Sequence, residues 1–152
     1  YEKIVLSVVV MILILVTLIF MFVSQRKFME NQKLSLAFTI PVQVYLGWIS
    51  VASIANITAL LVHFKWNGFG ISQPIWAIIM IIIGGILGLI MLFKFNAIAY
   101  SLVIVWAYIG IIIKRNLSTP VYKEIIITSS IMIAILLIAV IRSGILLIKK
   151  NS

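Results

Sequence analysis

Long, uninterrupted apolar runs constrain this chain more than any other feature of its sequence. Each run holds about 18 to 24 residues, the length that a helix needs to cross a hydrocarbon layer of about 30 Å. Hydrophobic residues make up 64% of the 152 residues and charged residues only 10%, whereas a soluble domain carries about a quarter charged residues. We therefore expect a multi-pass protein of the cell membrane.

The runs predict an all-α fold: a transmembrane helical bundle of about five spanning helices in a single domain. A very short link around Lys94 and Asn96 predicts that the third and fourth helices form an antiparallel hairpin. Because the chain opens on Tyr1, we expect it to be a fragment that lacks N-terminal residues. The expected helices cover residues 4–23, 36–63, 75–93, 97–113 and 125–148, and a polar loop is expected over residues 24–33.

The net charge of +9 indicates contact with lipid headgroups and not with nucleic acid. Lys and Arg cluster at the ends of the apolar runs, where they anchor helices to a bilayer surface. Positive charge is divided almost evenly between the two faces of the expected bundle, so the sequence leaves the orientation open. The lipid bilayer is the expected partner.

Residues for catalysis or metal binding are scarce. The chain has no Cys, a single His63, and only Glu2, Glu30 and Glu124 as acids. Thiolate and histidine-rich metal sites are therefore not expected. We find no nucleophile–base pair of the kind that a hydrolase needs, so the chain is not expected to be an enzyme.

The second helix carries the most informative side chains. At 100° per residue, one narrow stripe holds Tyr45, Trp48, Ala52, Asn56 and His63. An unpaired amide in hydrocarbon is costly, so Asn56 is expected either to hydrogen-bond a neighbouring helix or to contact a ligand. His63 lies near the helix end, where it is either a headgroup-level residue or a ligand contact.

The run YLGWISVASIAN, residues 45–56, resembles the last-helix signature of the tryptophan-rich sensory protein, or TspO/MBR translocator, family. Identity and spacing match at Tyr45, Leu46, Trp48, Ala52 and Asn56. The run departs from the signature too, since Val44 stands at its proline position.

This resemblance implies a pocket for a small planar hydrophobic ligand, a porphyrin above all, and a role in binding, sensing or transport. It further implies that the first two helices correspond to the last two of the family, with three additional helices after them. Two alternatives remain open, a structural or assembly subunit and a component of a small-solute transporter. The sequence also leaves homo-oligomerisation open.

Small residues in the third and fourth helices predict close packing. Gly84 and Gly88 form a G-x-x-x-G motif, which lets two membrane helices approach closely. Ala107 and Gly110 share one face of the fourth helix and are expected to contact a neighbour. Outside the helices, Phe69 belongs to a loop that is expected to lie in an aromatic belt at the membrane surface.

Overall fold

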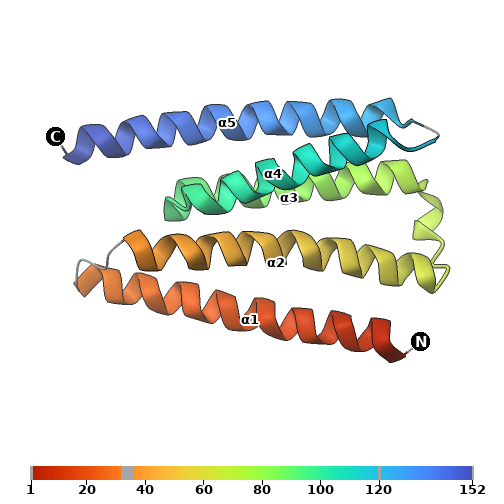
Figure 1. The fold of residues 1–152 in the computed structure, drawn as a ribbon, viewed down its shortest axis with the longest axis horizontal. Coiled ribbons are helices and arrows are strands. Elements are labelled where there is room, and N and C mark those ends of the chain that lie inside the picture. The colour runs from red at the N-terminus through yellow and green to blue at the C-terminus, as the bar shows by residue number, and fades with distance from the viewer. Residues whose placement is uncertain (1, 32–35, 120, 152) are drawn as a thin grey trace. The chain divides into compact units, whose positions relative to one another are not determined.

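The computed structural model describes residues 2–31, 36–119 and 121–151, and across these residues the chain is helical (Figure 1). The all-α prediction is confirmed, because the described part holds five α-helices and no strand. A single 3-10 turn, η1, precedes the third helix. The bounds are α1 Glu2–Asn31, α2 Leu36–His63, η1 Gly68–Gly70, α3 Gln73–Phe95, α4 Ile98–Asn116 and α5 Lys123–Asn151.

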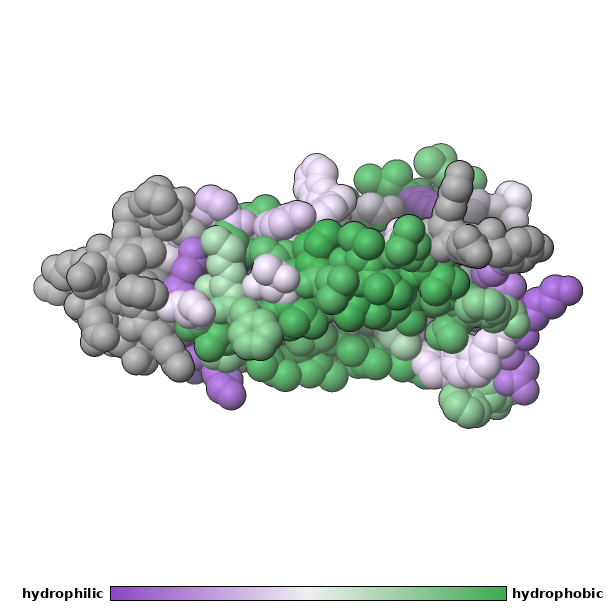
Figure 2. Space-filling view, turned by 90° about the horizontal axis from the view of Figure 1, so that it is seen from below, coloured by the Kyte–Doolittle hydropathy of each residue, from purple (hydrophilic) through white to green (hydrophobic). Residues whose placement is uncertain are grey.

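Each of the five helices contains a segment long and apolar enough to cross a membrane. The shortest of these segments, Ile98–Asn116, has 19 residues, which at 1.5 Å per residue gives about 28 Å. On the face drawn in Figure 2, apolar side chains cover the middle and hydrophilic ones gather toward the ends. The chain is therefore an integral membrane protein, as its composition predicted.

Helix α1 is longer than expected. The sequence predicted a loop from residue 24, but the helix continues to Asn31, although its membrane-spanning segment ends at Arg26. The added residues, SQRKFMEN, include good helix formers such as Gln, Arg, Lys, Met and Glu. The expected loop is wrong over residues 24–31, because these polar residues end the membrane-spanning segment but do not end the helix. Residues 32–35 lie outside the described part.

A tight turn joins α3 and α4, as the short link predicted. Asn96 ends α3 in the left-handed conformation, with φ 51°. The Asn96 N–H donates to the Leu92 carbonyl at 2.9 Å and the Ala97 N–H to the Met91 carbonyl at 3.1 Å. Asn accepts this conformation more readily than most residues, which explains why it can close a helix here. The two helices consequently form an antiparallel hairpin.

The chain divides into two compact units, Tyr1–Trp66 and Asn67–Ser152. In the first, which we call the α1–α2 unit, α1 packs along α2; in the second, the α3–α5 unit, the three helices contact one another. Each unit is described by itself, so the single domain stays a prediction.

Candidate functional site

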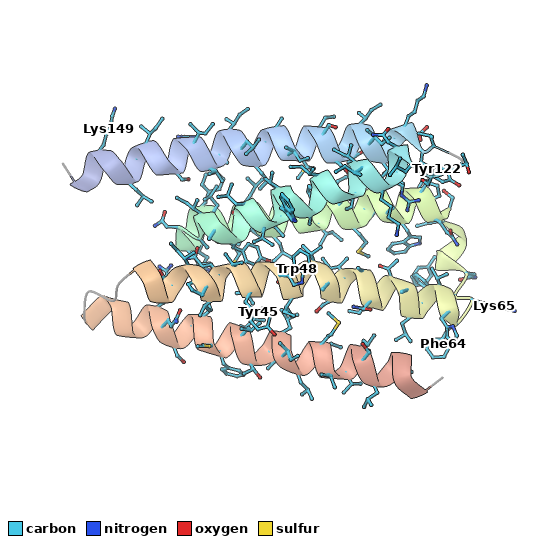
Figure 3. The ribbon with its side chains drawn as sticks, viewed as in Figure 1. Tyr45, Trp48, Phe64, Lys65, Tyr122 and Lys149 are labelled. Atoms are coloured by element: carbon cyan, nitrogen blue, oxygen red, sulfur yellow. The ribbon has the colours of Figure 1, made fainter. Side chains whose placement is uncertain are left out.

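The aromatic residues of the predicted stripe are exposed on α2. Tyr45 is 48% exposed and Trp48 is 53% exposed, and both project from the middle part of the helix, one turn apart (Figure 3). Three residues along a helix turn the side chain by about 300°, so the two rings share a face. This face offers two adjacent aromatic surfaces within a membrane-spanning segment.

Helix α2 buries a different stripe. Val42, Leu46, Ile49 and Ser53 are each 7% exposed or less, and their spacing of three and four residues places them on one helical face. The Ser53 Oγ has no hydrogen-bond partner in the described part of the chain. The structure therefore separates the packed side of α2 from the side that carries Tyr45 and Trp48.

Asn56 lies at the border of these two sides and connects α2 to α1. Its Nδ2 donates to the Met11 Sδ at 2.8 Å and to the Ala52 carbonyl at 3.1 Å. Of the two interpretations left open for this amide, the interhelical hydrogen bond is therefore present. The role of Met11 could not be predicted from the sequence, because a methionine in an apolar run does not stand out from its apolar neighbours.

The two remaining residues of the stripe differ in their surroundings. Ala52 is half-buried and His63 is exposed at the last position of α2. The His63 ring meets Phe64 edge-on, with ring centroids 5.9 Å apart. Fifteen residues separate His63 from Trp48, about 22 Å along the axis, which is more than a single tetrapyrrole spans. His63 thus lies apart from the two aromatic rings of the stripe.

The glycines of α3 create close contacts inside the α3–α5 unit. A Cβ at Gly84 would lie 2.8 Å from the Tyr108 hydroxyl, so the missing side chain leaves the space that this hydroxyl fills. The same hydroxyl donates a hydrogen bond to the Ile81 carbonyl. This contact of Tyr108 was not predicted from the sequence. A tyrosine opposite a G-x-x-x-G motif on an adjacent helix is the signal that could have indicated it.

Gly88 and Gly85 receive side chains from α4 and α5. A Cβ at Gly88 would lie 3.1 Å from Leu136 and 3.6 Å from Ile104, and one at Gly85 would overlap Met132. The fully buried Ser101 donates from its Oγ to the Gly88 carbonyl at 2.9 Å. The order of these contacts, Gly85 with Met132 and Gly88 with Leu136, shows that α3 and α5 run parallel.

The second pair of predicted packing residues behaves differently. Ala107 is half-buried, whereas Gly110 is exposed, and a Cβ there would meet nothing within 4 Å. Among the described residues of the α3–α5 unit, Gly110 therefore does not make the predicted packing contact. Helix α4 turns its buried side along Tyr100, Ile104 and Tyr108, away from Gly110.

Neither unit shows a group of three or more His, Cys, Asp or Glu residues that could hold a metal ion among the residues searched. A model of the TSPO-like protein family matches residues 1–142, which include α1 to α4 and most of α5. The match extends the resemblance far beyond residues 45–56 and includes the helices expected to be additional. Among curated proteins and solved structures, none matches the chain.

Proposed function

The chain belongs to the TSPO-like protein family, and on that basis we propose that it binds a flat hydrophobic ligand of the porphyrin type in the cell membrane. The ligand is not chemically transformed. Binding serves sensing or transport of the ligand. The observation that carries the proposal is the pair of half-exposed rings, Tyr45 and Trp48, on one face of a membrane-spanning helix.

The chemistry of this face suits a planar apolar molecule. Aromatic pairs stack with ring centroids about 4.5 to 7 Å apart and contribute about 0.5 to 1.5 kcal/mol beyond the apolar area that they bury. Two rings one helical turn apart give a large flat ligand two such contacts. Ala52, one turn beyond Trp48, adds no bulk that would keep the ligand from the helix.

Asn56 supplies the polar group of the proposed site. Its Nδ2 is held between Met11 and Ala52, which fixes the orientation of the amide. In the proposed complex the amide oxygen accepts a hydrogen bond from a polar edge of the ligand. Trp48 and Asn56 are eight residues apart, about 12 Å along the helix, comparable with the width of a tetrapyrrole. His63 lies at headgroup level and is the outer limit of this surface.

Titration with protoporphyrin tests the proposal. Binding is followed by quenching of Trp fluorescence and by the shift of the porphyrin absorption band, in wild type, Trp48→Leu and Asn56→Leu. Loss of one stacking ring should weaken binding about tenfold, which corresponds to about 1.4 kcal/mol. Asn56→Leu should weaken it less. The absorption measurement is needed because Trp48→Leu also removes a fluorophore.

A structural or assembly subunit is the second candidate function, and the Asn56–Met11 contact favours it. In that case the stripe serves only to hold helices together. Trp48→Leu and Asn56→Leu would then lower the melting temperature without a ligand-specific effect. Unchanged porphyrin affinity in both folded variants would exclude α2 as the binding surface and leave the assembly role. A small-solute transporter component predicts the same unchanged porphyrin affinity, together with substrate flux in vesicles.

A further inference from the structure

Two loops at one end of the α3–α5 unit carry unusually exposed apolar side chains. Phe69, in η1, is 78% exposed, and Leu117, directly after α4, is 83% exposed. Both values exceed that of Trp106, an exposed aromatic residue within the α4 span, at 68%. Large apolar side chains are unfavourable in a loop that faces only water, and large exposed apolar groups usually mark a contact surface.

The two loops lie at the same end of this unit. The α3–α4 hairpin is antiparallel, so the start of α3 and the end of α4 are neighbours (Figure 1). The spans of α3, α4 and α5 begin or end here, at Gln73, Asn116 and Lys123. Loops that join membrane-spanning segments necessarily lie at the bilayer surface.

The Phe69 ring is held outward by a structured turn. Phe69 adopts φ 57° and ψ 28°, a left-handed conformation that is uncommon for a residue other than glycine. The Asn67 Oδ1 accepts the Phe69 N–H at 3.1 Å, and the Trp76 Nε1 donates to the Gly68 carbonyl at 2.9 Å. Gly68, at φ 62°, is covered so closely by Trp76 that a Cβ would lie 2.8 Å from its Nε1. The chain thus keeps a strained conformation that exposes an aromatic ring.

Positive charge surrounds the second loop. Lys114 and Lys123 are exposed. The Arg115 guanidinium lies 5.9 Å from the centre of the Tyr122 ring. Glu124 is the acidic residue of the same segment, so this segment carries three cations and one anion. This balance favours a negatively charged partner.

We propose that this end of the α3–α5 unit is an insertion surface for a leaflet of anionic phospholipids. We define the insertion surface as Phe69 and Leu117 together with Lys114, Arg115 and Lys123. The two apolar side chains enter the boundary between headgroups and acyl chains, and the cations bind lipid phosphates, the arrangement that aromatic and basic residues favour at membrane interfaces. This inference is independent of the ligand proposed for α2.

Site-specific labelling tests the insertion surface, because the chain has no native Cys. Phe69→Cys and Leu117→Cys are labelled with an environment-sensitive fluorophore in the full chain, reconstituted in phosphatidylcholine vesicles with or without an equal amount of phosphatidylglycerol. Ser72→Cys and Thr119→Cys are matched controls, since both are exposed polar positions in the same two loops. Iodide reports access from water, and lipids with a shallow nitroxide report insertion.

At positions 69 and 117 we expect blue-shifted emission, with iodide quenching about threefold weaker than at the controls. Phosphatidylglycerol should increase nitroxide quenching about twofold, and the double variant Lys114→Gln/Lys123→Gln should cancel that increase. High salt should cancel this increase too, and this measurement replaces the double variant if that variant does not fold. Equal iodide quenching at all four positions, or no response to phosphatidylglycerol, would overturn the proposal.

Discussion

The α1–α2 unit and the α3–α5 unit differ in the contacts that hold their helices together. In the α3–α5 unit, glycines on α3 admit Tyr108 and Leu136, and all of the largest fully buried side chains belong to this unit. In the α1–α2 unit, the interhelical hydrogen bond from Asn56 ends on a thioether, a weak acceptor. The comparison indicates packing around glycines in one unit and exposed aromatic side chains on α2 in the other.

The physical reason for this difference lies in the medium. Lipid tails are as apolar as Leu, so membrane helices associate through close packing and interhelical hydrogen bonds instead of the hydrophobic effect. The α3–α5 unit satisfies both conditions, with small residues on α3 and Ser101 bonded to the Gly88 carbonyl. Helix α1 has long apolar side chains along most of its span and no glycine. Helix α1 itself therefore offers no glycine that could admit a side chain from α2.

The largest stability effect is expected at Gly88. Gly88→Leu forces a side chain into the contacts with Leu136 and Ile104 and should destabilise the protein by about 1 to 3 kcal/mol, the usual cost of overpacking. Gly110→Leu is the matched control, because open space surrounds that position. Thermal unfolding in detergent measures both. Equal melting temperatures for the two variants would show that α3 does not depend on its glycines.

A pair of buried serines should show a smaller effect. Ser101→Ala removes the hydrogen bond to the Gly88 carbonyl and should cost about 0.5 to 1.5 kcal/mol. The Ser129 Oγ is buried without a partner in the described part of the chain, so Ser129→Ala should be neutral or stabilising. Denaturant titration of the two variants gives the difference in free energy of unfolding. A greater loss for Ser129→Ala would contradict the assigned contacts.

The smallest effect is expected in the α1–α2 unit. A double-mutant cycle of Asn56→Leu and Met11→Leu should give a coupling energy of about 0.6 kcal/mol or less, the average for hydrogen bonds between membrane helices. Each free energy of unfolding is measured in the same detergent. A coupling energy well above the free energy of unfolding lost in Ser101→Ala would reverse the expected order of contact strength between the two units.

Most of the fold could be predicted from the sequence, because run length alone identifies a membrane-spanning helix. The bounds of α2 agree with the prediction. The turn between α3 and α4 also lies where it was predicted, at Asn96. The end of α1 could not be predicted from composition, because polar residues end the membrane-spanning segment but continue the helix. Gly110 shows a further limit: periodicity identifies a face but not whether another helix covers it.

The candidate site was only partly predictable for a related reason. The shared face of Tyr45, Trp48 and Asn56 follows from helical periodicity. The contact between Asn56 and Met11 depends on how α1 lies against α2. No local sequence pattern indicates how the residues of these two helices align. The same holds for Tyr108, whose position in the space left by Gly84 requires the packing of α3 against α4.

The protoporphyrin affinity of Trp48→Leu, set against that of Trp106→Leu, tests the central claim most directly. Both residues are exposed tryptophans within membrane-spanning segments, one on α2 and one on α4. Each variant therefore removes one exposed indole ring, and the two rings belong to different units. Trp48→Leu should bind about tenfold more weakly than wild type, while Trp106→Leu should bind as wild type does. Equal affinities in the two folded variants would contradict the assignment of the ligand to α2.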